Sequence, residues 1–280
     1  MATIASLHIY PVKSCGAVDL AMATLGPAGL ESEGVGDREW MVVDAGGMFV
    51  TQREAPRMAL IAPTIKDGML VLDAPGMTPL SIQLRGFAPR TATLDVQVWN
   101  HACRALDEGD AAAAWLSSFL GRKLRLARFD PAHKRASNRK WTGDIEALNR
   151  FSDGFPILVI SQASLADLNG RLQRAGRASL PMNRFRPNIV LGDVGPFDED
   201  RIVSLRAGEA TLKSAKPCPR CPIPSIDQTT GVRGPDPLDI LAQYRDDARL
   251  GVVFGQNVVV AAGIGSVLRV GQELDAEWNF

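Results

Sequence analysis

The chain has 280 residues, of which 46% are hydrophobic and 22% charged, so it can bury a large core in one or two globular domains. Its 31 basic and 31 acidic residues give a formal net charge of zero, so no overall field would draw it onto nucleic acid, and we expect no nucleic-acid function. Four cysteines without a disulfide framework, and a start that lacks a signal peptide, predict a cytoplasmic protein. The longest apolar region, residues 251–270, is interrupted by Gln256, Asn257 and several glycines, so we expect no membrane span.

The first hundred residues show the pattern of short β-strands. Turn residues such as those at 45–47 and 66–68 separate the apolar runs. Closely spaced strands with glycine-rich turns are typical of a barrel or sandwich. The predicted strands are 4–11, 40–43, 49–51, 58–62, 69–72, 80–84 and 92–98.

The first predicted helix covers residues 111–120. Asp110 suits the N-cap, Gly121 suits the end, and Trp115, Leu116 and Phe119 give one apolar face. We place the domain change here, with an N-terminal β-barrel-like domain at 1–120 and a second domain at 121–280.

The second half combines strands with a few helices. After a strand at 124–128 comes an irregular polar stretch to about residue 150, and Ser161 can cap a helix that ends near residue 172. Asp236-Pro237 predicts a last helix over 238–244. The whole chain is therefore predicted to be mixed α/β and β-rich, with a barrel-like second domain. Its further predicted strands are 157–160, 188–191, 201–205, 210–213, 252–260 and 266–270.

Two of the four cysteines stand in Lys216-Pro217-Cys218-Pro219-Arg220-Cys221, which we expect to form a proline-stiffened loop. A thiolate beside a fixed cation can serve as a soft metal ligand or a nucleophile. One CxxC and three scattered histidines fall short of a zinc site, and the prolines disfavour a helical dithiol motif. Both cysteines could also be ordinary buried residues of a turn, and the pair alone leaves this open.

Motifs along nearly the whole chain resemble one known family. Residues 9–16 (IYPVKSCG), 36–40 (GDREW) and 51–53 (TQR) resemble the β-barrel domain found ahead of MOSC domains. Residues 184–189 (RFRPNI), the CPRC segment with its following Ile-Asp and Thr-Gly, and 254–257 (FGQN) resemble the MOSC domain itself. The arrangement is similar to MOSC-domain proteins that include the mitochondrial amidoxime-reducing component and its bacterial relatives.

The resemblance implies a molybdenum cofactor held by one protein thiolate, and it gives the metal-ligand role to Cys221. A pterin dithiolene supplies two sulfurs to the metal and carries an anionic phosphate. The protein must therefore add one soft thiolate for the metal and several cations for the phosphate. Any one arginine of these motifs, seen alone, would be interpreted as a solvated surface charge. Asp227 is a candidate proton donor, although an aspartate in such a turn more often accepts local hydrogen bonds. The implied cofactor-binding residues are Lys13, Ser14, Arg38, Asp153, Arg186, Asn188, Pro219, Arg220 and Cys221.

The implied activity is two-electron reduction of small N-hydroxylated compounds, such as amidoximes, hydroxylamines or N-hydroxylated bases. Electrons would come from a separate ferredoxin, flavodoxin or cytochrome-like protein, because the chain has neither a ferredoxin-type cysteine run nor a nicotinamide-binding fingerprint. The alternative is a carrier of molybdenum cofactor or of sulfur without turnover. The lack of a pyridoxal-phosphate domain argues against a complete sulfurase.

Two further groups of residues lie outside the motifs described above. The basic run His133-Lys134-Arg135 with Arg139-Lys140 is most simply a solvated loop, with a docking surface for an acidic electron donor as the alternative. Trp141, and the His101-Ala102-Cys103 cluster that follows Trp99, are interpreted as packing residues.

Overall fold

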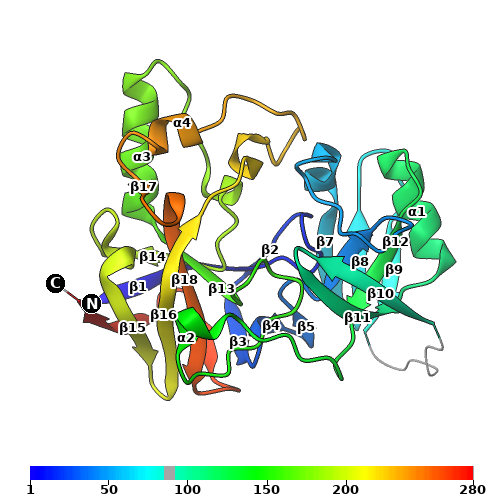
Figure 1. Ribbon diagram of the computed structural model, residues 1–280, viewed down its shortest axis with the longest axis horizontal. Helices are drawn as coiled ribbons and strands as arrows, with labels where there is room; N and C mark the ends of the chain where they lie inside the picture. The colour runs from blue at the N-terminus through cyan, green and yellow to red at the C-terminus, as the bar shows by residue number, and fades with distance from the viewer. Residues whose placement is uncertain (85–91, 280) are drawn as a thin grey trace.

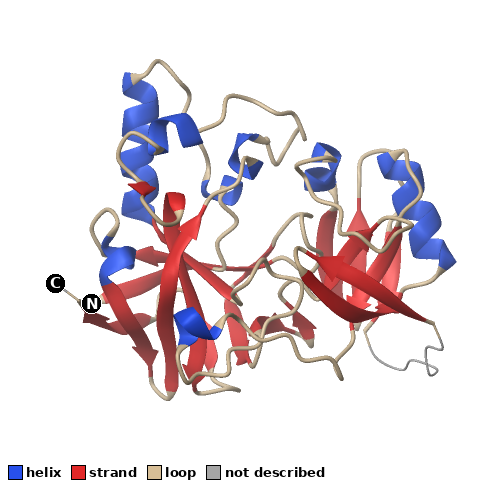
Figure 2. Cartoon of the chain, viewed as in Figure 1, coloured by secondary structure: helices blue, strands red, loops and turns tan. Residues whose placement is uncertain are grey.

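The computed structural model describes residues 1–84 and 92–279. Figure 1 shows two β-rich lobes, with both chain termini on the same lobe. Strands make up most of each lobe, and most of the helices lie along the upper side of the molecule in this view (Figure 2). The predicted mixed, β-rich fold class is confirmed.

A closed barrel of seven strands forms the lobe that carries the termini. Hydrogen-bonded neighbours follow one another around the ring, and β18 pairs with β13 to close it. The ring runs through β13 (Ile157–Ser161), β14 (Ile189–Gly192), β1 (Ala2–Ile9), β20 (Glu273–Trp278), β15 (Ile202–Ala207), β16 (Ala210–Pro219) and β18 (Gly251–Ala262). Two short strands, β2 (Val18–Leu20) and β17 (Asp246–Asp247), pair with β1 and β18.

Three smaller sheets complete the β-structure of the described residues. One contains β10 (Thr93–Val98), β11 (His101–Asp107), β12 (Arg125–Phe129) and β6 (Trp40–Val43). A second contains β7 (Ala62–Lys66), β8 (Met69–Asp73) and β9 (Leu80–Gln83). The third joins β19 (Val267–Arg269) to β3 (Met22–Gly26), β4 (Gly29–Ser32) and β5 (Val35–Gly36).

The helices follow their sequence signals closely. In α1 (Asp110–Leu120), Gly121 ends the helix with a left-handed φ of 74°. Gly109 is its N-cap, and Asp110, predicted to cap it, is instead the first helical residue. The Ser161 hydroxyl caps α3 (Gln162–Arg174) as predicted, by accepting a hydrogen bond from Ser164 N. The other α-helices described are α2 (Arg139–Thr142) and α4 (Leu238–Leu241).

Two expectations need correction. Residues 58–62 were expected to be a strand, but Pro56–Leu60 is a 3-10 turn that begins with proline. The segment 216–219, expected to be a loop, is the end of β16, where irregular register accommodates prolines that lack an N–H. The sheets join segments from both sides of residue 120, because β1 belongs to the barrel and β12 pairs with β6.

No helix within residues 1–84 or 92–279 is long and apolar enough to cross a membrane.

Candidate cofactor site

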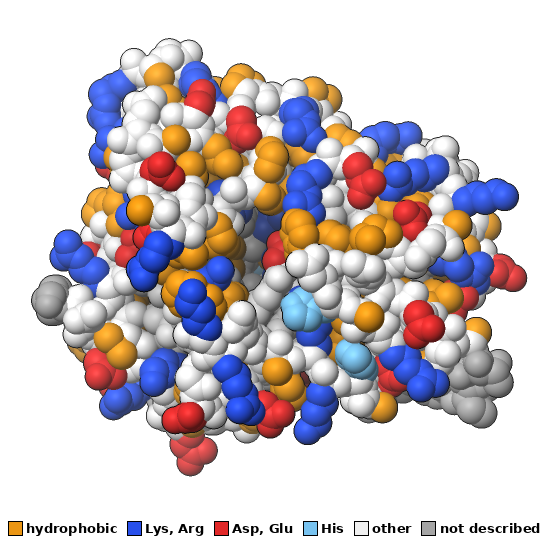
Figure 3. Space-filling model, viewed as in Figure 1, with side chains coloured by type: hydrophobic (Ala, Val, Ile, Leu, Met, Phe, Trp, Pro, Cys, Tyr) orange, Lys and Arg blue, Asp and Glu red, His pale blue; other side chains and the backbone are white. Residues whose placement is uncertain are grey.

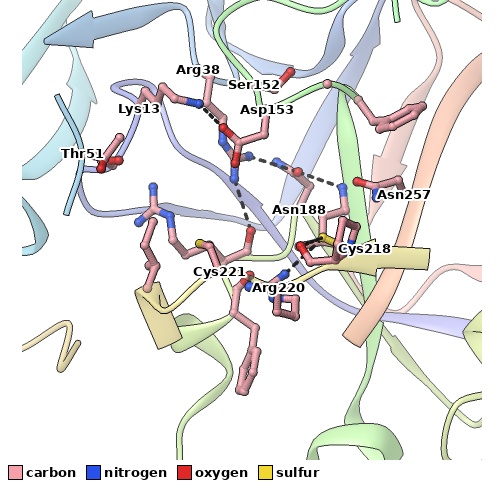
Figure 4. A pocket seen from close by; sticks show the side chains of 18 of the residues that line it. Lys13, Arg38, Thr51, Ser152, Asp153, Asn188, Cys218, Arg220, Cys221 and Asn257 are labelled. Atoms are coloured by element: carbon pink, nitrogen blue, oxygen red, sulfur yellow. Dashed lines mark hydrogen bonds and ion pairs between the residues drawn. The ribbon is translucent and has the colours of Figure 1, made fainter. Parts of the chain in front are cut away.

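A pocket lies where segments from both halves of the sequence meet. Figure 3 shows a hollow near the centre of one face of the molecule, with basic side chains around it. All residues that the sequence predicted to bind a cofactor line this pocket (Figure 4). The lining residues are Lys13, Ser14, Arg38, Thr51, Arg53, Ser152, Asp153, Gly154, Phe155, Leu158, Phe185, Arg186, Asn188, Cys218, Pro219, Arg220, Cys221, Ile223 and Asn257.

The lining is strongly basic. It contains five basic side chains and one carboxylate, that of Asp153, although the net charge of the whole chain is zero. Concentrated charge of one sign in a concave site raises the local concentration of ligands of the opposite sign. The pocket is therefore suited to an anionic ligand. Its basic residues are Lys13, Arg38, Arg53, Arg186 and Arg220.

Backbone strain gathers at the same place. Ser14, Arg38 and Arg186 have φ values of 67°, 47° and 58°, in the left-handed region that non-glycine residues seldom adopt. Each such residue costs on the order of 1–3 kcal/mol, and such residues cluster at binding and catalytic sites. Three such residues line this one pocket, which is typical of a binding site.

A buried polar network fixes Arg38. The carboxylate of Asp37 accepts from Arg38 Nη1 at 2.6 Å and from Asn188 Nδ2 at 2.9 Å. Asn188 Oδ1 accepts from Arg38 Nη1 at 3.2 Å and from Leu158 N at 3.1 Å. Asn188 therefore holds Arg38 in position in addition to lining the pocket.

The ring of Tyr10 lies between two guanidinium groups. Arg38 is 4.4 Å and Arg186 is 4.2 Å from its centroid. Arg186 is 8% exposed, its Nη1 donates to Cys15 O at 2.6 Å, and its buried Nη2 has no partner among the residues described. Burial lowers the pKa of Arg186 to about 10, so the side chain is still a cation at neutral pH. A lining residue of the pocket thus carries a charge and an N–H group without a hydrogen-bond partner among the described residues.

Lys13 and Asp153 form an ion pair at the pocket. Lys13 Nζ donates to Asp153 Oδ1 at 2.5 Å and to Phe151 O at 2.8 Å, and Trp99 Nε1 donates to the same Asp153 oxygen at 3.0 Å. Partial loss of water around Asp153 opposes its ionisation, but the charge and hydrogen bond of Lys13, with the Trp99 hydrogen bond, outweigh this effect and hold the pKa of Asp153 below its usual range. The Asp153 side chain is 67% exposed, so water weakens this effect.

Both cysteines of the CPRC segment line the pocket. Arg220 Nη1 donates to Cys218 Sγ at 3.4 Å, and Nη2 donates to Phe185 O at 2.9 Å. The arginine therefore contacts Cys218 rather than Cys221. Within residues 1–84 and 92–279, no group of three or more His, Cys, Asp or Glu side chains could hold a metal ion. A metal bound here would take one thiolate from the protein, and its other ligands would come from a cofactor or from solvent.

Asp227 lies outside the set of lining residues. Its Oδ1 accepts from the backbone N–H groups of Thr229 and Thr230 at 2.9 Å, and its Oδ2 pairs with Arg184 at 2.7 Å. The two backbone hydrogen bonds lower the pKa of Asp227, which keeps it ionised. A group that stabilises a turn as a carboxylate is a poor proton donor, so the predicted catalytic role has no support in this geometry.

Arg135 differs from the rest of its basic run. It is 5% exposed, and its guanidinium donates to Asn149 Oδ1 and to the carbonyls of Arg150 and Ser152, both at 2.7 Å. Arg135 thus supports the segment that carries Ser152 and Asp153, and the surface interpretation was wrong for it. We call the three exposed basic residues of this run, Lys134, Arg139 and Lys140, the basic loop.

Sequence reasoning assigned no role to several lining residues. Thr51 and Arg53 belong to the TQR motif and Asn257 to the FGQN motif, so the motifs themselves were the available signal. Phe155 carried no such signal, because only the folded chain brings it to the pocket.

Comparison with known proteins agrees with these motifs. The MOSC N-terminal beta barrel domain family matches residues 1–123, and the MOSC domain family matches residues 147–275. Mitochondrial amidoxime reducing component 2 of Bos taurus is 36% identical over 87% of this chain and 72% of that protein. Mitochondrial amidoxime-reducing component 1 of Homo sapiens is 36% identical over the same shares of the two chains.

A protein of Bordetella bronchiseptica with a known solution structure is 26% identical, covering 39% of this chain and 88% of that one. Its TM-score of 0.32 allows no conclusion about the fold. The two domain matches, and the relatives matched over 87% of this chain, show the family without it. The chain belongs to the family of MOSC-domain proteins with an N-terminal MOSC β-barrel domain, to which the amidoxime-reducing components also belong.

Proposed function

We propose that this protein is a molybdenum-cofactor-dependent reductase of small N-hydroxylated compounds, such as amidoximes, hydroxylamines and N-hydroxylated bases. The observation that carries the proposal is the presence of the Cys221 thiol in a pocket lined by five basic side chains. The names of the relatives, amidoxime-reducing components, support the substrate class.

The residues present fit such a cofactor. Its phosphate and pterin need cationic and N–H donors, and the buried Nη2 of Arg186 and Nε of Arg220 have no partner among the described residues. Its metal needs a soft ligand, and Cys221 and Cys218 are the thiols in the lining. We assign the ligand role to Cys221, as the family resemblance implies, and Cys218, whose Sγ accepts a hydrogen bond from Arg220, would lie beside it.

Each part of the pocket then has a separate task. Arg38, Arg186 and Lys13 would hold the anionic groups of the cofactor, and Asn188 would keep Arg38 in place. When bound, the cofactor supplies the redox chemistry, in which two electrons and two protons cleave the substrate N–O bond and release water. The electrons come from a separate donor protein.

The test is turnover by purified protein that has been loaded with molybdenum cofactor. Reduced methyl viologen would serve as electron donor and benzamidoxime as substrate, with benzamidine measured by chromatography. The proposal predicts benzamidine in proportion to bound molybdenum. Bound molybdenum without benzamidine would instead indicate a cofactor carrier.

A further inference from the structure

Trp99 occupies an unusual place at the tip of a β-hairpin. Strands β10 and β11 pair up to Val98 and His101, so Trp99 and Asn100 are the two turn residues. Trp99 has a φ of 54°, and Asn100 does not have a positive φ. A turn that needs positive φ at its first central residue favours glycine there. The indole is also 40% exposed, so core packing does not explain a tryptophan at this position.

Three contacts hold the exposed ring beside the pocket. Trp99 Nε1 donates to Asp153 Oδ1 at 3.0 Å, and the Arg53 guanidinium lies 4.4 Å from the ring centroid. The Phe49 ring packs against it with centroids 5.2 Å apart. Asp153 and Arg53 line the pocket, whereas Trp99 does not, so the indole stands at the rim. A strained residue that its neighbours hold in one place is typical of a binding site.

The exposed Trp99 ring at the rim of a basic pocket can bind an apolar part of a ligand. The pocket lining combines its five basic side chains with the apolar side chains of Phe155, Phe185, Leu158 and Ile223, and the Trp99 ring would extend this apolar surface to the rim. Aromatic rings stack with an energy beyond that of area burial alone. A substrate whose N–O group enters the pocket could therefore rest its conjugated part on the indole.

We propose that the Trp99 ring binds the planar conjugated part of the substrate at the pocket rim and is a specificity-determining residue for aryl over small N-hydroxylated compounds. The inference rests on the proposed function, because it names the substrate class of that same site. The simpler explanation is that the indole N–H only orients Asp153. The two explanations differ in which part of the side chain matters.

Two substitutions separate the ring from the N–H group. Trp99→Phe keeps a flat ring and removes the hydrogen bond to Asp153, and Trp99→Leu removes the ring as well. KM and kcat would be measured with benzamidoxime and with hydroxylamine, which has no planar group to stack, using reduced methyl viologen and matched molybdenum content. Benzamidoxime binding would also be measured by calorimetry, which needs no turnover. Unchanged melting temperatures would show that both variants fold.

The expected result is a KM for benzamidoxime about tenfold higher in Trp99→Leu, the size of one aromatic stacking interaction. The KM for hydroxylamine should stay within about twofold, and Trp99→Phe should stay within about threefold of wild type for both substrates. Equal effects on both substrates, no effect of Trp99→Leu, or the same loss in Trp99→Phe as in Trp99→Leu would overturn the inference.

A wild-type protein that carries molybdenum but reduces neither substrate would refute the proposed function and leave calorimetry to decide about Trp99. About tenfold weaker benzamidoxime binding by Trp99→Leu would then still support the ring-binding role. Unchanged binding, or no binding by the wild type, would overturn it.

Discussion

Replacing Arg186 by methionine should separate ligand binding from folding stability. Methionine keeps an apolar stem but removes the charge and the N–H groups of a residue that is 8% exposed. Three effects on the stability of the cofactor-free protein oppose one another. Burial lowers the pKa of Arg186 to about 10, a cost of roughly 3 kcal/mol to the charged form.

The offsetting interactions are of similar size. The hydrogen bond from Arg186 to Cys15 O contributes about 1.5–3 kcal/mol, and the contact with the Tyr10 ring contributes about 2 kcal/mol when desolvated. The free energy of unfolding should therefore fall by no more than about 2 kcal/mol in Arg186→Met. Cofactor affinity should fall about ten- to 150-fold, because one charge-assisted bond to the ligand is lost.

The assay measures molybdenum and pterin per protein after expression in a cofactor-competent host, together with urea unfolding of cofactor-free protein. Arg245→Met is the matched control, because Arg245 also stacks on an aromatic ring, that of Phe197, but its partner is the partly buried carboxylate of Asp200. Removing it leaves that carboxylate unpaired and should cost about 3–5 kcal/mol with normal molybdenum content. Normal molybdenum content in Arg186→Met, with a loss of stability like that of the control, would refute the reasoning.

The remaining predictions concern other parts of the site. Cys221→Ser should abolish benzamidoxime reduction, because a hard hydroxyl replaces a soft thiolate, while Cys218→Ser should retain part of it; equal losses in rate would remove the assignment. The pKa of Asp153 is lowered on folding, so its stabilising effect is present above about pH 4 and is lost as pH falls, and the melting temperature of Asp153→Asn should drop less than that of wild type between about pH 4 and pH 2. Parallel melting curves for the two proteins would contradict this. Asp227→Asn should lower the melting temperature but keep kcat within about threefold, and a tenfold or greater loss of kcat would restore it as a proton donor. Neutralising the basic loop should slow reduction by an acidic donor protein and leave viologen-driven turnover nearly intact, and an unchanged salt dependence of the donor-driven rate would exclude this docking surface.

The pocket could be predicted from the sequence because each part of it stands in a short motif that resembles the MOSC family. Lys13 and Ser14, Arg38, and Arg186 with Asn188 come from three separate motifs, and the fold brings them to one place. The left-handed φ values of Ser14, Arg38 and Arg186 were not foreseeable, because serine and arginine carry no signal for them.

The parts that sequence reasoning missed depend on long-range contacts. Arg135 looked like a surface charge within a basic run, but three acceptors between Asn149 and Ser152 draw it inside. Trp99 was interpreted as a packing residue, because only the folded hairpin places it beside Asp153, 54 residues away in the chain. The placement of β1 in the barrel of the second half likewise has no local signature, because strand pairing partners are set by the whole fold.

The most direct test of the central claim is the rate of benzamidoxime reduction plotted against bound molybdenum, in one series of preparations with graded cofactor loading. If Cys221 and the basic pocket hold a redox-active cofactor, the rate should rise in proportion to molybdenum, pass through zero without it, and vanish in Cys221→Ser at any loading. Reduction that is independent of molybdenum content, or full molybdenum content without reduction, would contradict it.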